Sequence, residues 1–169
     1  MRPTFRLAAV LVLVLAASPL AAAPPPAAAQ DALPIYDTTS LGALAIEAAS
    51  RAAADSGRRL LVNFGTNDCG PCRVFNDAVF EEPFLTAFLG QFVPVFVDVA
   101  PGSPNRDLLA RYGIDPTKGF PAVVFSDERL QLSETTKDGE LAAVCARGKD
   151  AAREWLLKRF LKDKPERPR

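Results

Sequence analysis

Short apolar runs recur along this chain, and segments with helical spacing of apolar and polar residues separate them. Three runs are rich in Leu, Val and Phe and are flanked by turn-forming residues such as Gly and Pro, which is typical of buried β-strands. A fourth run is shorter and less apolar. The predicted strands are residues 59–64, 92–99, 121–125 and 130–133.

The intervening segments predict helices. The first is alanine-rich, Thr38-Thr39-Ser40 can cap its start, and Gly57 can end it. The predicted helices are residues 41–55, 71–79, 83–89, 105–112 and 149–161. Strands and helices alternate at first, whereas two strands follow each other closely before the last helix. This order predicts an α/β fold in which helices flank a central mixed β-sheet.

The first 29 residues have a different pattern from the rest. Arg2 and Arg6 form a basic start, and an apolar run of eleven residues follows at 7–17. A bilayer core requires about 20 apolar residues, so this run is too short to cross one. The pattern is typical of a cleaved signal peptide, with Ala27-Ala28-Ala29 as the favoured cleavage site. An uncleaved membrane anchor is the alternative.

Export would place the mature chain in the periplasm or another compartment outside the cytoplasm, where disulfides persist. We see no internal repeat and no second linker, so we expect one folded domain after the signal. The predicted division is a signal peptide at 1–29, an extended segment at 30–40, a single domain at 41–162 and a charged tail at 163–169.

Charge and composition exclude several classes of function. Lys plus Arg and Asp plus Glu both number 20, so there is no electrostatic case for binding nucleic acid. The chain has no histidine, which excludes Ser-His-Asp and Cys-His catalysis, His-ligated zinc or copper, and haem attachment through Cys-x-x-Cys-His. We therefore expect no metal and no other cofactor.

The motif Cys69-Gly70-Pro71-Cys72 lies where a predicted strand gives way to a predicted helix. The helix N-terminus can stabilise a thiolate on Cys69, which would attack a partner disulfide, and Cys72 would then resolve the mixed disulfide. A structural disulfide and half of a zinc site are the alternatives. Structural zinc takes four protein ligands, however, and this chain has three cysteines.

Together with Gly119-Phe120-Pro121, which opens a later apolar strand, the Cys-Gly-Pro-Cys motif and the strand before it resemble the thioredoxin superfamily. The chain is most similar to exported thioredoxin-like domains such as the C-terminal domain of DsbD. That similarity rests on residues 69–73, 79–80, 83 and 95–98. The resemblance implies a thioredoxin-like fold. It also implies that Pro121 is a cis-proline facing the disulfide, where it would prevent metal capture and offer the Phe120 backbone to a substrate peptide. An ordinary trans proline is the alternative.

Two departures from the thioredoxin pattern change the expected chemistry. Asp68 replaces the tryptophan before the first cysteine, and its carboxylate disfavours the Cys69 thiolate, which pushes the couple toward a reductant. Asn63 replaces the buried aspartate and cannot accept a proton, so the usual base for the resolving thiol is missing. Asn63 could equally be a satisfied buried amide. Cys145 is expected to be a small buried apolar residue; an intermolecular disulfide or a reactive thiol is the alternative.

The favoured function is therefore an exported thiol–disulfide oxidoreductase acting on the cysteines of other exported proteins. Reduction, or electron relay from a membrane donor, is favoured over oxidation. An isomerase would normally require dimerisation and no dimer segment is visible, so we expect a monomer. The alternative is a non-catalytic binding or chaperone module on the same scaffold, with a structural disulfide between Cys69 and Cys72.

Overall fold

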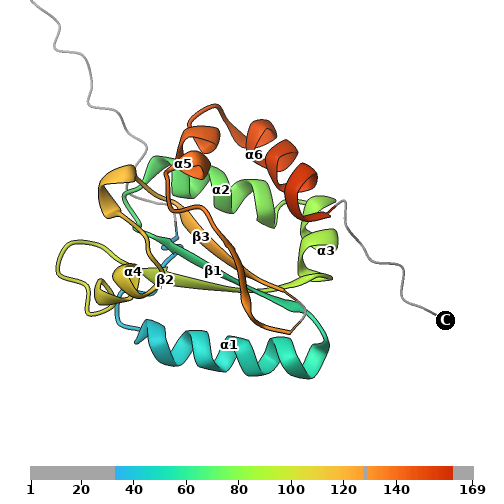
Figure 1. The fold of residues 1–169 in the computed structure, drawn as a ribbon. Helices are drawn as coiled ribbons and strands as arrows, with labels where there is room; N and C mark the ends of the chain where they lie inside the picture. Colours follow the sequence, from blue (N-terminus) through green and yellow to red (C-terminus); the bar gives the residue numbers. More distant parts are fainter. Residues whose placement is uncertain (1–32, 128, 162–169) are drawn as a thin grey trace, which may run out of the picture. The chain divides into compact units, whose positions relative to one another are not determined.

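Four strands form one mixed sheet in the computed structural model, which describes residues 33–127 and 129–161 (Figure 1). The strands are β1 Arg59–Gly65, β2 Phe92–Asp98, β3 Ala122–Ser126 and β4 Leu132–Thr135. Their order across the sheet is β2-β1-β3-β4. β1 is parallel to β2 and antiparallel to β3, and β3 is antiparallel to β4. The predicted α/β fold with a central mixed sheet is thereby confirmed.

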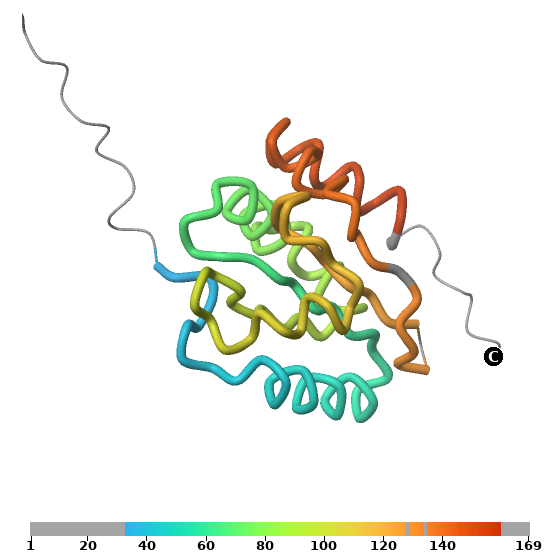
Figure 2. The backbone as a smooth tube through the Cα atoms, turned by 60° about the vertical axis from the view of Figure 1, so that its left-hand side comes forward, coloured from blue at the N-terminus to red at the C-terminus, as the bar shows by residue number. Residues whose placement is uncertain are grey.

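Helices cover both faces of this sheet. The long helix α1 lies along one face, and α2, α5 and α6 form a layer on the other, as Figures 1 and 2 show. The helices are α1 Gly42–Ser56, α2 Gly70–Phe80, α3 Phe84–Leu89, α4 Asp107–Arg111, α5 Glu140–Cys145 and α6 Lys149–Leu156. A 3-10 turn at Pro116–Lys118 precedes β3, and a π-helical turn, Leu157–Leu161, continues α6.

Side chains of β1 alternate between two apolar clusters, one on each face of the sheet. Leu60 and Val62 belong to the cluster under α1, whereas Leu61 packs with α2, α5 and α6. Because successive side chains of a strand point to opposite faces, Asn63 and Gly65 lie on the α2 side with Leu61. This alternation brings Asn63 and Gly65 beneath the helix that carries the cysteine pair.

The start of α1 differs from the prediction. The helix begins after Leu41, which makes no capping hydrogen bond, and Thr39 bonds Asp37 instead. The N–H of Gly42 donates to Oδ1 of Asn105 at 2.7 Å. The side chain of Asn105, which is distant in sequence, therefore caps the helix in place of the expected local residues. The helix ends as predicted, at Gly57 in the left-handed conformation.

The segment between the last strand and the last helix also differs. α5 was not predicted, and β4 lies about two residues later than expected. α5 has only six residues, and it packs Leu141 and Val144 into the cluster around α2. Such a short helix is stabilised by packing rather than by local propensity.

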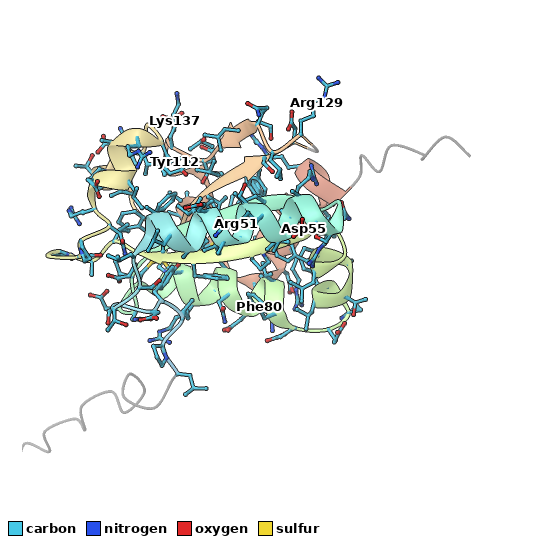
Figure 3. The ribbon with its side chains drawn as sticks, turned by 90° about the horizontal axis from the view of Figure 1, so that it is seen from below. Arg51, Asp55, Phe80, Tyr112, Arg129 and Lys137 are labelled. Carbon is cyan, nitrogen blue, oxygen red and sulfur yellow. A yellow bond between two sulfur atoms is a disulfide. The ribbon has the colours of Figure 1, made fainter. Side chains whose placement is uncertain are left out.

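No helix in the described part of the chain is long and apolar enough to span a membrane. The predicted signal peptide (1–29) and charged tail (163–169) lie outside the described residues. Of the segment 30–40, residues from 33 onward are described, and Tyr36 is fully buried. Seen from the α1 side, Arg51 and Asp55 lie on the exposed face of this helix (Figure 3).

Candidate active site

A disulfide joins Cys69 and Cys72 at the start of α2. Cys69 is the N-cap residue, and its sulfur accepts a hydrogen bond from the N–H of Cys72 at 3.1 Å. Cys69 is half-buried as a residue, whereas Cys72 is completely buried. A partner can therefore reach Cys69 but not Cys72, which is the asymmetry that a nucleophilic and a resolving cysteine require.

The local sequence explains why the helix begins here. β1 ends at Gly65, a short turn follows, and Pro71 occupies the first turn of α2, where its missing N–H and fixed φ favour helix initiation. The unsatisfied N–H groups and the partial positive charge of the helix start stabilise an anion at Cys69 once the disulfide is reduced.

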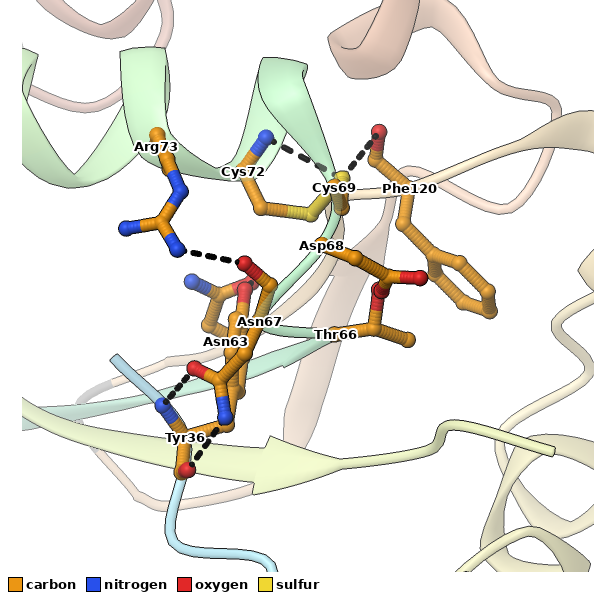
Figure 4. Close-up of a disulfide and its surroundings, with 9 residues drawn as sticks. All are labelled: Tyr36, Asn63, Thr66, Asn67, Asp68, Cys69, Cys72, Arg73 and Phe120. Atoms are coloured by element: carbon orange, nitrogen blue, oxygen red, sulfur yellow. Dashed lines mark hydrogen bonds between the residues drawn. A yellow bond between two sulfur atoms is a disulfide. The ribbon is translucent and has the colours of Figure 1, made fainter. Parts of the chain in front are cut away.

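The peptide bond between Phe120 and Pro121 is cis, as the resemblance implied. It brings the Phe120 carbonyl oxygen to 3.4 Å from the Cys69 sulfur (Figure 4). Pro121 is buried at the start of β3, and Phe120 is half-buried beside the disulfide. The backbone before Pro121 thus lies against the accessible sulfur.

Asp68 is exposed next to Cys69 and hydrogen-bonds to its neighbour Thr66. The Thr66 hydroxyl donates to the Asp68 carboxylate, and this bond lowers the pKa of Asp68 below its ordinary value. Asp68 therefore carries its negative charge at neutral pH. That charge disfavours a thiolate on Cys69, although solvent and salt screen an exposed carboxylate.

Asn63 is completely buried on the α2 side of β1. Its Oδ1 lies 3.4 Å from the hydroxyl of Tyr36, which donates to it. Its Nδ2 has no hydrogen-bond partner among the described residues. The reading of Asn63 as a fully satisfied amide is therefore wrong for its nitrogen. Such a buried unpaired donor is uncommon and costly, so it requires an explanation.

Sequence reasoning missed the contribution of the segment before α1. The backbone N–H groups of Ile35 and Tyr36 both donate to Oδ1 of Asn67, and Nδ2 of Asn67 donates back to the Tyr36 carbonyl at 2.9 Å. Arg73 of α2 donates to the Asn67 carbonyl at 2.7 Å. Figure 4 shows this network between Tyr36 and the cysteine pair. The one available signal was the pair of large apolar residues Ile35 and Tyr36 in a segment without a strand or helix pattern.

Cys145 lies in α5, within the apolar cluster that includes α2, and is the free cysteine. It is 1% exposed, and burial raises its pKa to about 12. Its interpretation as a small buried apolar residue is confirmed. In the described part of the chain, no group of three or more Cys, Asp or Glu residues is placed to hold a metal ion.

Comparisons with known proteins agree with this geometry. A sequence profile described as thioredoxin-like matches residues 42–127. A solved disulphide isomerase from Xylella fastidiosa Temecula1 is 27% identical, with a TM-score of 0.67 over 75% of this chain and 96% of that one. A thioredoxin from Thermus thermophilus is 24% identical, with a TM-score of 0.42 over 60% of this chain and 85% of that one.

The oxidised C-terminal domain of Neisseria meningitidis DsbD is 21% identical to this chain. The match has a TM-score of 0.44 and covers 62% of this chain and 86% of the DsbD domain. A comparison with curated proteins finds no match.

Proposed function

The chain belongs to the thioredoxin-like family, and from that premise we propose that it is an exported thiol–disulfide oxidoreductase acting on the cysteines of other exported proteins. One observation carries the proposal. The Cys69–Cys72 disulfide lies at a helix N-terminus with Cys69 accessible and Cys72 buried, beside the backbone that precedes Pro121. That arrangement allows exchange through one sulfur at a time.

The proposed reaction proceeds in two exchange steps. The Cys69 thiolate attacks one sulfur of a partner disulfide, which forms a mixed disulfide and releases the other partner sulfur as a thiolate. The Cys72 thiolate then attacks the Cys69 sulfur and releases the second partner thiolate. The partner gains two electrons, and the Cys69–Cys72 pair becomes the disulfide. The proton from the Cys72 thiol passes to the partner thiolate released first or to solvent.

The residues around the cysteine pair have supporting roles that follow from where they lie. Gly70 and Pro71 set the spacing of the two sulfurs at the start of α2, and the backbone at Phe120 and Pro121 would pair with an extended partner segment. Asp68 destabilises the reduced Cys69 thiolate, which favours a reductant. Such a reductant requires an electron supply, for which we propose a membrane donor, and a signal peptide over residues 1–29 would place the chain beside it.

Reduction of a protein disulfide tests the proposal directly. The reduced protein should reduce a disulfide-bonded test protein, and Cys69→Ser should abolish this reaction. Cys72→Ser should instead accumulate a mixed disulfide through Cys69, while Cys145→Ala, which removes a buried thiol that takes no part in the proposed exchange, should retain the reaction. Activity that survives Cys69→Ser would contradict the proposal and favour a binding module with a structural disulfide.

A further inference from the structure

Gly65 lies at a close approach between Tyr36 and Cys72. A Cβ atom built on Gly65 would overlap the Tyr36 hydroxyl oxygen and would lie 2.9 Å from the Cys72 sulfur. The phenol and the buried sulfur are therefore neighbours across the bare face of this glycine. Because Gly65 has no side chain, Tyr36 from the segment before α1 can approach the buried Cys72 sulfur.

Asn63 supplies the second donor in this small buried space. It lies two residues before Gly65 on the same strand, so both face α2 and its Cys72. The Asn63 carbonyl oxygen accepts from Tyr36, but its buried amide nitrogen has no partner in the part of the chain that the structure describes. The space therefore contains a phenolic O–H, which is bonded to Asn63 in the oxidised protein, and an amide NH2 group for which the disulfide is no strong acceptor.

The charged and titratable groups around this space come from three elements. Burial raises the pKa of Tyr36 far above its ordinary value, so its hydroxyl stays protonated; the hydrogen bond to Asn63 lowers that pKa in part, and Cys145 and Asp98 raise it. Asp98 lies at the end of β2, in register with Gly65, and is 3% exposed with one carboxylate oxygen unpartnered. Cys69 lies on the far side of Cys72 in α2.

We propose that the Asn63 amide nitrogen, and the Tyr36 hydroxyl once it turns from Oδ1 of Asn63, are the hydrogen-bond donors that stabilise the Cys72 thiolate when the disulfide opens. The proposal rests on the proposed function and explains how a chain without a base at position 63 can still resolve a mixed disulfide. A buried anion is stabilised by donors that are already in place, whether or not a base takes its proton. The sulfur is the acceptor that the unpaired Asn63 amide lacks in the oxidised protein.

The pKa of Cys72 in a Cys69→Ser background tests this proposal without any exchange reaction. Thiolate absorbance is followed against pH, and Cys145 titrates separately because of its own pKa of about 12. Tyr36→Phe should raise the Cys72 pKa by about one unit, as expected for the loss of one hydrogen bond to a charged group. Asn63→Leu, which keeps the branching of the side chain but removes the amide, should also raise it.

Tyr112→Phe is the matched control. Tyr112 packs against Phe64 in the cluster under α1, on the opposite face of the sheet, so loss of its hydroxyl should leave the Cys72 pKa unchanged. In the protein with all cysteines, Tyr36→Phe should slow resolution at neutral pH about threefold and leave the first attack unchanged. The thiolate fraction falls about tenfold, and the greater nucleophilicity of a more basic thiolate restores part of the rate.

The proposal is overturned if Tyr36→Phe and Asn63→Leu, both folded by circular dichroism, leave the Cys72 pKa unchanged. It is also overturned if Asp98→Asn lowers that pKa while Tyr36→Phe and Asn63→Leu leave it unchanged, because the carboxylate and not the two donors would then set the pKa of the thiol. If Tyr36→Phe does not fold, the Cys72 pKa in Asn63→Leu alone tests the proposal. Absence of exchange with every test disulfide would contradict the proposed function and leave the pKa result standing.

Discussion

The side-chain oxygen of Asn105 accepts a hydrogen bond from the backbone N–H of Gly42 at 2.7 Å, although 63 residues separate them. The Asn105 amide nitrogen donates in turn to the carbonyls of Ser40 and Asp98. One buried side chain thus joins the start of α1 to the end of β2 and satisfies backbone groups of both.

Asn105→Ala should lower the free energy of unfolding by about 2–3 kcal/mol, because it leaves buried backbone groups unpaired. Urea denaturation followed by circular dichroism measures this change. Thr39→Ala is the control: Thr39 lies where a local cap was expected, but its hydroxyl bonds only the exposed Asp37. An equal loss in the two variants would show that Asn105 does not cap α1.

Gly65→Ala should destabilise the protein by about 1–3 kcal/mol, because the new methyl group would overlap the Tyr36 phenol beside Cys72. Thermal unfolding compares it with Gly70→Ala. The side chain at position 70 would meet open space at the start of α2, so that variant should be neutral or slightly stabilising. A Gly65→Ala protein as stable as its parent would contradict the close approach described here.

Asp68→Asn should make the Cys69–Cys72 couple more oxidising, because loss of the adjacent carboxylate stabilises the Cys69 thiolate. Equilibration with glutathione buffers measures the reduction potential. The shift should be larger at low ionic strength, since Asp68 is exposed to solvent. Asp77→Asn, which removes an exposed charge further along α2, is the control. A potential that falls in Asp68→Asn would reverse this reading of the carboxylate.

Glu81, just after α2, forms ion pairs with Lys149 and Arg153 of α6, and these lower its pKa below the ordinary 4.5. A carboxyl group whose pKa is lower in the folded state stabilises the fold above its unfolded pKa, and that contribution is lost as the pH falls through the folded value. Glu81→Gln should therefore be less stable than the parent at neutral pH and equally stable in strong acid.

Urea denaturation at several pH values measures the difference between the parent and Glu81→Gln. A double-mutant cycle with Lys149→Met should show coupling at neutral pH that disappears in acid. A difference that stays constant down to strong acid would mean that Glu81 stabilises the fold by packing rather than by charge.

In the oxidised protein, Cys145 should react very slowly with thiol reagents at mildly alkaline pH and rapidly once urea unfolds the chain. Its burial in α5 raises its pKa to about 12, so few thiolates exist in the folded state. Cys145→Ser should cost about 1–3 kcal/mol, because it buries a hydroxyl in an apolar cluster. Rapid labelling of the folded protein would show that Cys145 is accessible.

The elements that carry their own local pattern were predictable. The strand before the cysteine motif and the helix after it follow from apolar runs and from Gly70 and Pro71, and the cis-proline follows from a resemblance. α5 also has a helical pattern, since Leu141 and Val144 are three residues apart, but six residues are too few for that pattern to exceed chance.

The long-range contacts were not predictable from the sequence. Hydrogen bonds between distant segments are made by Asn105, Asn67 and Tyr36. They depend on which segments meet in the folded chain, and the identity of one residue does not indicate which distant residue it will contact. Asn63 shows the same limit, because the sequence indicates a missing carboxylate but not the Tyr36 phenol that hydrogen-bonds to Asn63.

The Asn67 side chain, which pairs with the backbone at Ile35 and Tyr36, makes the segment ahead of the first helix a component of the disulfide site. The point at which the chain is shortened or fused at its amino end therefore affects the disulfide site as well as solubility. A shortened form that begins after Tyr36 would retain every strand and helix together with both cysteines. It would nevertheless lack the phenol that lies beside Cys72, and the boundary of the disulfide site is thus set by a residue that belongs to no helix or strand.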